Sequence, residues 1–126
     1  NNHHQFLVKD WLNRNIDKQL SEKGEPKHLV LFTQNYSLYW LDTLSSGFST
    51  STLFNRLLDP KIPRDPKEKV KLLCDFGVTH LIWEDGHTQS VLAGVWTWLK
   101  LTKNSVLYQT SDATVFHLPC SQDEIQ

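Results

Sequence analysis

The chain has 126 residues, a length typical of one domain that can bury its own hydrophobic core. Hydrophobic residues make up 39% and charged residues 21%, which excludes the disordered and collagen-like classes. With 13 Lys and Arg against 14 Asp and Glu, the net charge of −1 gives no general electrostatic footprint for nucleic acid. We therefore expect a single domain over residues 1–126 and no nucleic-acid partner.

The first predicted element is an amphipathic helix over about residues 5–20, within an N-terminal helical segment 1–24. Apolar residues such as Phe6, Trp11 and Ile16 recur along one stripe, and charged residues occupy the other face. The simpler interpretation is a helix packed on the domain. The alternative is a juxtamembrane helix that follows a membrane segment.

The next segments predict one strand and two less regular elements. The apolar run His28–Gln34 is typical of a strand buried on both faces, as in a parallel sheet. The aromatic segment Asn35–Leu44 fits either a helix or an extended conformation. A polar loop over residues 45–52 precedes Leu53–Leu58, for which we expect a short helix.

The clearest local signal predicts a helix between Asp65 and Gly77. Asp65 is a good N-cap, Pro66 suits the first helical position, and Glu68 completes a pattern similar to a capping box. Gly77 supplies a left-handed stop, and the apolar run Val78–Trp83 predicts a strand directly after it.

The last third of the chain predicts a turn at residues 84–86, a helix from about Thr88 to Leu101, and two strands. The strands Ser105–Thr110 and Ala113–Leu118 have a link short enough for a hairpin. We expect residues 119–126 to form a frayed tail.

Alternation of helices and strands favours right-handed crossovers between parallel strands. The sequence therefore predicts the α/β class. The expected architecture is a small three-layer sandwich whose sheet is mainly parallel, with a C-terminal antiparallel hairpin.

The sequence predicts no catalytic residue, metal or cofactor. His80 and His117 fall on predicted strands without the close spacing of zinc ligands, so we expect them to be hydrogen-bonded in or beside the sheet. The chain has no nucleophile elbow and no glycine-rich phosphate loop. Cys74 and Cys120 either form a single bridge, in an oxidising compartment, or remain two free thiols.

Candidate ligand-binding residues gather at the predicted strand ends. In open α/β sheets ligands bind beyond the carboxyl ends of the strands, and exposed aromatic rings can stack on sugars. The candidates by these two criteria are Gln34, Asn35, Tyr36, Trp40, Glu84 and Asp85. The simpler interpretation of Glu84–Asp85 is a solvated turn.

Trp96 and Trp98 are two residues apart on a predicted helix and cannot both face its core side. One of them should be exposed. For the other, we expect packing against the N-terminal helix.

Two segments resemble a known family. Leu72–Trp83, with Gly-Val-Thr-His at Gly77–His80, and the closing hairpin Val106–Gln109 with Ala113–Leu118 are similar to the C-terminal extracytoplasmic domain of GT-C-type polytopic membrane glycosyltransferases and their bacterial relatives. The resemblance spans residues 28–118. His117 departs from it, because the family often has Arg at this position.

The resemblance implies a small α/β sandwich on the extracytoplasmic side of a membrane, periplasmic in a bacterium. In this family the catalytic acid lies in an early loop among the membrane helices, and nothing in this chain matches it. The implied role is therefore non-catalytic: to cap the transmembrane portion of the same polypeptide, upstream of Asn1, or to help hold an acceptor or a lipid-linked sugar donor.

Two other functions stay open at this point. One is a freestanding soluble α/β binding module for a protein or a small ligand, with a pocket near Gln34, Asn35, Glu84 and Asp85. The other is a small enzyme that uses His80 or His117 with a bound metal.

Overall fold

The computed structural model describes residues 3–16, 29–33, 38–40, 61–62, 64–84 and 92–121. These residues contain three helices and five strands: α1 (His3–Asn15), β1 (Leu29–Phe32), β2 (Leu38–Trp40), α3 (Pro66–Phe76), β3 (Val78–Glu84), α4 (Val95–Leu101), β4 (Val106–Gln109) and β5 (Ala113–His117). The polar loop 45–52 and the short helix expected at Leu53–Leu58 lie outside the described residues.

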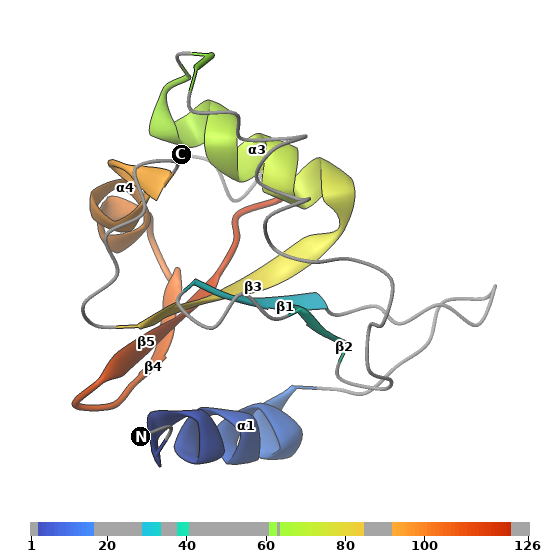
Figure 1. Ribbon diagram of the computed structural model, residues 1–126, viewed down its shortest axis with the longest axis vertical. Helices are drawn as coiled ribbons and strands as arrows, with labels where there is room; N and C mark the ends of the chain where they lie inside the picture. Colours follow the sequence, from blue (N-terminus) through green and yellow to red (C-terminus); the bar gives the residue numbers. More distant parts are fainter. Residues whose placement is uncertain are drawn as a thin grey trace, which may run out of the picture.

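The elements form three layers, with the sheet in the middle. Figure 1 shows α1 against one face of the sheet and α3 with α4 against the other. This arrangement confirms the predicted α/β class and the three-layer sandwich.

The strands follow the order β2-β1-β3-β5-β4. Among these described strands only the β1–β3 pair is parallel, whereas β1–β2, β3–β5 and β4–β5 are antiparallel. The C-terminal hairpin is confirmed, but the prediction of a mainly parallel sheet is wrong. The link from β1 to β2 is too short for a crossover, and the hairpin inserts β5 beside β3, so each of these neighbours runs antiparallel.

Helix α3 begins and ends where its local sequence predicts. The Asp65 side chain accepts a hydrogen bond of 2.8 Å from the Glu68 backbone N–H, and Pro66 occupies the first turn. Gly77 ends the helix at φ 107°, and its N–H bonds back to Cys74 and Leu73 carbonyls. The chain turns directly into β3 from this residue.

Helix α4 is shorter than predicted because Gly94 adopts a left-handed conformation, with φ 81°. A Cβ atom at Gly94 would lie 2.8 Å from Cγ of Pro66, so the start of α4 approaches the start of α3 very closely. Residues 85–91, where the predicted helix would begin, lie outside the described residues.

The core consists of one buried cluster on each face of the sheet. The cluster under α3 and α4 comprises Leu31, Val70, Leu73, Val78, Leu81, Leu92, Val95, Leu99, Phe116 and Leu118. The cluster under α1 comprises Val8, Leu12, Val30, Ile82, Ala113 and Val115. Strand β1 contributes Leu31 to one and Val30 to the other, so it is buried on both faces as predicted.

The tryptophans follow this division of the core. Trp98 is half-buried against the α3–α4 cluster and Trp96 is exposed, so the expectation that one of them packs on the N-terminal helix is wrong. The aromatic partner of α1 is Tyr108 of β4, which stacks on Trp11 with ring centroids 5.2 Å apart.

A disulfide joins Cys74 in the last turn of α3 to Cys120, three residues beyond the end of β5, with a Cα–Cα distance of 5.4 Å. The sequence leaves open whether these cysteines form a bridge or remain free thiols, and the structure contains the bridge. Pro119 is buried and Cys120 is tethered, so the chain is held in place through residue 120, past the predicted start of the tail.

Candidate functional site

The parallel pair β1–β3 brings two chain segments together at its carboxyl edge. Thr33 follows β1 and Glu84 ends β3, and their backbones meet through the Thr33 hydroxyl. This hydroxyl accepts a hydrogen bond from the Glu84 N–H and donates one to the Ile82 carbonyl, both at 3.1 Å. The Thr33 N–H also donates to the Ile82 carbonyl, so one threonine extends the ladder beyond the last residue of β1.

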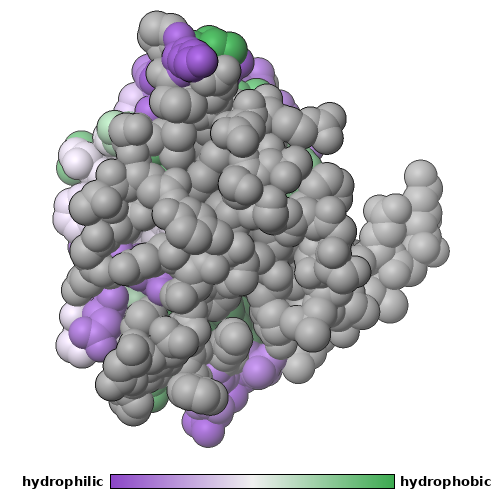
Figure 2. Space-filling model, in the orientation of Figure 1, coloured by the Kyte–Doolittle hydropathy of each residue, from purple (hydrophilic) through white to green (hydrophobic). Residues whose placement is uncertain are grey.

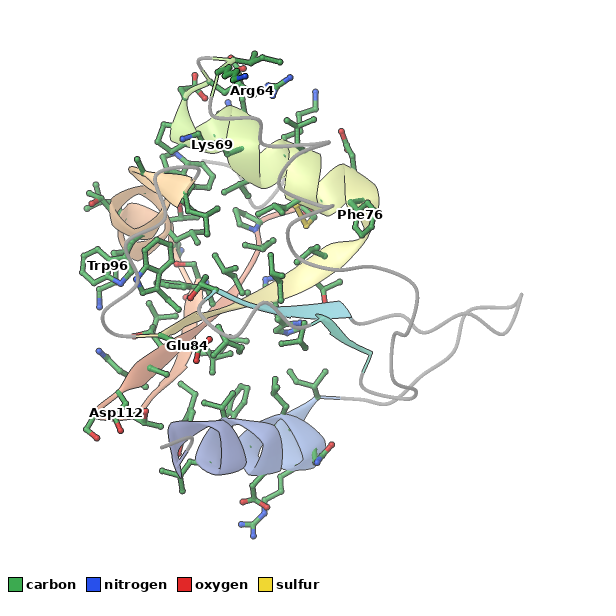
Figure 3. All side chains as sticks on the ribbon, in the orientation of Figure 1. Arg64, Lys69, Phe76, Glu84, Trp96 and Asp112 are labelled. Atoms are coloured by element: carbon green, nitrogen blue, oxygen red, sulfur yellow. A yellow bond between two sulfur atoms is a disulfide. The ribbon has the colours of Figure 1, made fainter. Side chains whose placement is uncertain are left out.

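Glu84 is fully buried and belongs to β3, which corrects its interpretation as part of a solvated turn. It pairs with Ala113 of β5 and, by strand alternation, shares a face with Ile82 in the cluster under α1. Figure 3 shows Glu84 at the end of β3, on the side of the sheet that α1 covers. A carboxyl group is costly to bury unless it has polar partners, which sets Glu84 apart from the apolar residues of the cluster under α1.

The structure tests few of the other candidate residues. The described residues do not include Gln34, Asn35, Tyr36 and Asp85. They do include Thr33 and Glu84, which directly precede Gln34 and Asp85 in the chain. Trp40 lies in β2, where its backbone pairs with Leu29 at the opposite end of β1 from Thr33. The backbone register therefore does not bring Trp40 to the carboxyl edge.

His80 and His117 are partners across the β3–β5 ladder, with ring centroids 5.5 Å apart in a T-shaped arrangement. The His80 ring is buried, and its Nδ1 lies 2.7 Å from the Thr79 hydroxyl. The contact with Thr79 agrees with the expectation of a hydrogen-bonded histidine in the sheet for His80. Two imidazoles supply fewer ligands than the three or four that zinc takes, and the described residues contain no cluster of three metal-ligating side chains.

Sequence reasoning missed two features of this region. Thr33 lies inside the predicted strand, but nothing in its local pattern indicates that its hydroxyl would join β1 to β3. The pairing of His80 with His117 depends on the register of an antiparallel ladder. The available signal was one histidine within the strand Val78–Trp83 and another near the end of the last predicted strand, Ala113–Leu118.

None of the helices in the described ranges has the length and apolar character needed to cross a bilayer. No family model, curated protein or solved structure matches the chain.

Proposed function

We propose that this chain is a non-catalytic extracytoplasmic domain of a membrane glycosyltransferase-like protein. In this proposal the carboxyl edge of β1 and β3 helps to hold an acceptor or a lipid-linked sugar donor. The observation that carries the proposal is the Cys74–Cys120 disulfide.

A disulfide of this kind is typical of secreted, periplasmic and cell-surface proteins, because cytosolic thiols are kept reduced. The bridge starts within one segment that carries the family resemblance, since Cys74 belongs to Leu72–Trp83, and it ends at Cys120, two residues beyond the closing hairpin segment Ala113–Leu118. An oxidising compartment on the outer side of a membrane is where such a domain would fold.

The geometry of the carboxyl edge supports a binding role through position. Thr33 and Glu84 hold the two strand ends side by side, so the segments that carry Gln34, Asn35 and Asp85 leave the sheet from neighbouring points. Glu84 itself is fully buried, and a ligand would reach its carboxyl group only after neighbouring atoms moved. Its role in the proposal is therefore to position the edge, while the residues after the strands contact the sugar.

The first test is the coding sequence upstream of Asn1. The proposal expects several segments of about 20 apolar residues there. A start codon close to Asn1 would contradict it and leave a freestanding binding module. Mass spectrometry of protein alkylated inside the producing cells supplies an independent check, because the proposal requires Cys74 and Cys120 to be oxidised before lysis.

The binding role has its own test, a titration of the oxidised domain with a polyprenyl-phosphate sugar, followed by backbone NMR. Asp85→Asn should weaken binding by about threefold, the order of magnitude of one weakened hydrogen bond to a sugar hydroxyl. Asp112→Asn, on the exposed hairpin turn, serves as the matched control and should leave binding unchanged. If a saturating ligand shifts no backbone resonance of the unaltered domain, the domain does not bind this class of sugar.

A further inference from the structure

Four large apolar side chains are exposed in the twelve-residue stretch from Trp96 to Leu107, which contains most of α4 and the start of β4. Trp96 is 39% exposed, Leu101 82%, Val106 39% and Leu107 38%. We name these four residues, together with Lys100 and Lys103, the α4–β4 surface. From Leu92 to Ser111 these two lysines are the only charged residues, so the stretch of sequence that forms the surface combines apolar residues with positive charge.

A hydrogen-bonded turn holds the two parts of this surface next to each other. The Thr102 N–H donates to the Leu99 carbonyl at 3.1 Å, and the Ser105 N–H donates to the Thr102 carbonyl at 3.3 Å. The Ser105 hydroxyl also bonds to the Leu99 carbonyl. These bonds fasten the end of α4, where Leu101 is exposed, to the start of β4 at Val106.

Trp96 and Lys100 form a second fixed unit, on the exposed side of α4. The Lys100 ammonium lies 5.1 Å from the centre of the Trp96 ring, one helical turn away. Figure 3 shows Trp96 beside α4 at the outer edge of the molecule. An amphipathic ring with an adjacent lysine is typical of side chains that sit at a membrane–water boundary.

The other exposed apolar residues among the described ones have acidic residues nearby. Ile62 lies beside Lys61 and Arg64, but also three residues before the exposed Asp65. The outer side of α3 carries the exposed acids Glu68 and Asp75, and exposed Leu7 on α1 has Asp10 nearby in the sequence. Figure 2 shows a hydrophobic spot beside strongly hydrophilic atoms at the top of the view, where the chain enters α3, whereas the left edge over α4 is pale.

We infer that the α4–β4 surface docks on the headgroup region of an anionic lipid bilayer. Leu101 enters the boundary between headgroups and acyl chains, Trp96 lies at the headgroup level beside Lys100, and Lys100 and Lys103 bind the lipid phosphates. A second copy is the less favoured occupant, because a two-fold interface would pair this lysine-bearing patch with itself. The inference goes beyond the proposed function, since it requires neither a sugar nor an upstream membrane segment.

The test is cosedimentation of the oxidised chain with phosphatidylcholine vesicles, with and without phosphatidylglycerol. We expect binding to the anionic vesicles alone, weakened by salt. The double variant Lys100→Gln/Lys103→Gln should lower the association constant by about thirtyfold, because each lysine near an anionic surface contributes about 1 kcal/mol. Leu101→Glu should lower it by about tenfold, because it removes an apolar side chain from the boundary and adds a negative charge. The matched controls are Leu7→Glu on α1 and Lys67→Gln/Lys71→Gln on α3, which should change it by less than about twofold.

Because these substitutions are at exposed positions, circular dichroism should show an unchanged fold for every variant. A blue shift of fluorescence on vesicle binding that disappears in Trp96→Phe would further support insertion of this ring. The inference is overturned if the unaltered chain ignores anionic vesicles, or if Leu101→Glu binds as the unaltered chain does. A concentration-dependent dimer that Leu101→Glu abolishes would overturn it in favour of a second copy. None of these readouts depends on sugar binding, so failure here and failure of the proposed function are distinguishable.

Discussion

Glu84 donates its backbone N–H to the hydroxyl oxygen of Thr33 at 3.1 Å, across the open end of the parallel pair β1–β3. The donor and the acceptor are 51 residues apart in the chain, and both residues are fully buried. The Thr33 hydroxyl therefore links the ends of β1 and β3 at the carboxyl edge of the sheet, which the candidate ligand-binding residues follow in the chain.

Replacement of Thr33 by Val keeps the shape of the side chain but removes the acceptor of the Glu84 N–H. We expect the free energy of unfolding to fall by about 1–3 kcal/mol, the cost of a buried donor without a partner. Urea denaturation measures this change, and hydrogen exchange of the Glu84 amide should become faster. Thr33→Ser retains the hydroxyl and should preserve protection of that amide. Equal exchange rates in the two variants would contradict a role for this bond.

Loss of the disulfide should cost far more. The bridge closes a loop with a sequence separation of 46 residues, for which loop-closure entropy predicts about 4 kcal/mol of stabilisation. We expect Cys74→Ser/Cys120→Ser to lower the free energy of unfolding by about this amount in urea denaturation. The unaltered chain with reductant should match the double variant, and a reductant effect on the double variant would indicate another cause.

The two glycines with positive φ offer a matched comparison. In Gly77→Ala the added Cβ has no atom within 4 Å, so only the backbone strain at φ 107° lowers the free energy of unfolding, by about 1–2 kcal/mol. In Gly94→Ala the backbone strain at φ 81° is similar, and the added Cβ also clashes with Cγ of Pro66 at 2.8 Å. We therefore expect Gly94→Ala to be the more destabilising of the two in thermal and urea unfolding. The reverse order would show that α3 and α4 separate easily at their starts.

Trp11 and Tyr108 stack with an interplanar angle of 15° and link α1 to the edge strand β4. A double-mutant cycle of Trp11→Leu and Tyr108→Leu should give a coupling energy of about 0.5–1.5 kcal/mol, the range for aromatic pairs. A cycle of Trp11→Leu with Trp96→Leu, on the opposite side of the sheet, is the control and should give a value near zero. Similar values in the two cycles would rule out a specific contribution of the stack.

The elements that sequence reasoning located best are those with signals inside a few residues. Helix α3 begins after Asp65 and ends before Gly77 because the cap hydrogen bond and the left-handed turn are local events. Helix α4 shows the limit of local reasoning. An amphipathic pattern predicts a start near Thr88, but the left-handed conformation of Gly94 makes Val95 the first residue of α4.

The candidate site was predictable only in outline. Glu84 was correctly selected as a residue at a strand end, yet its burial follows from the cover of α1 and the pairing with Ala113. No pattern in the sequence predicts the order of the strands in the sheet or their register. The Thr33 bond and the His80–His117 pair depended on that choice.

The sequence by itself determined the class of the fold, the caps of α3 and the C-terminal hairpin, because hydrophobic periodicity, caps and a short link act between near neighbours. Only the tertiary structure decided the mixed sheet order, the covalent pairing of Cys74 with Cys120, the partner of Trp11 and the exposure of the α4–β4 surface. Each of these depends on which elements from distant parts of the chain pack together, and that choice is made by the burial of whole faces rather than by any local pattern.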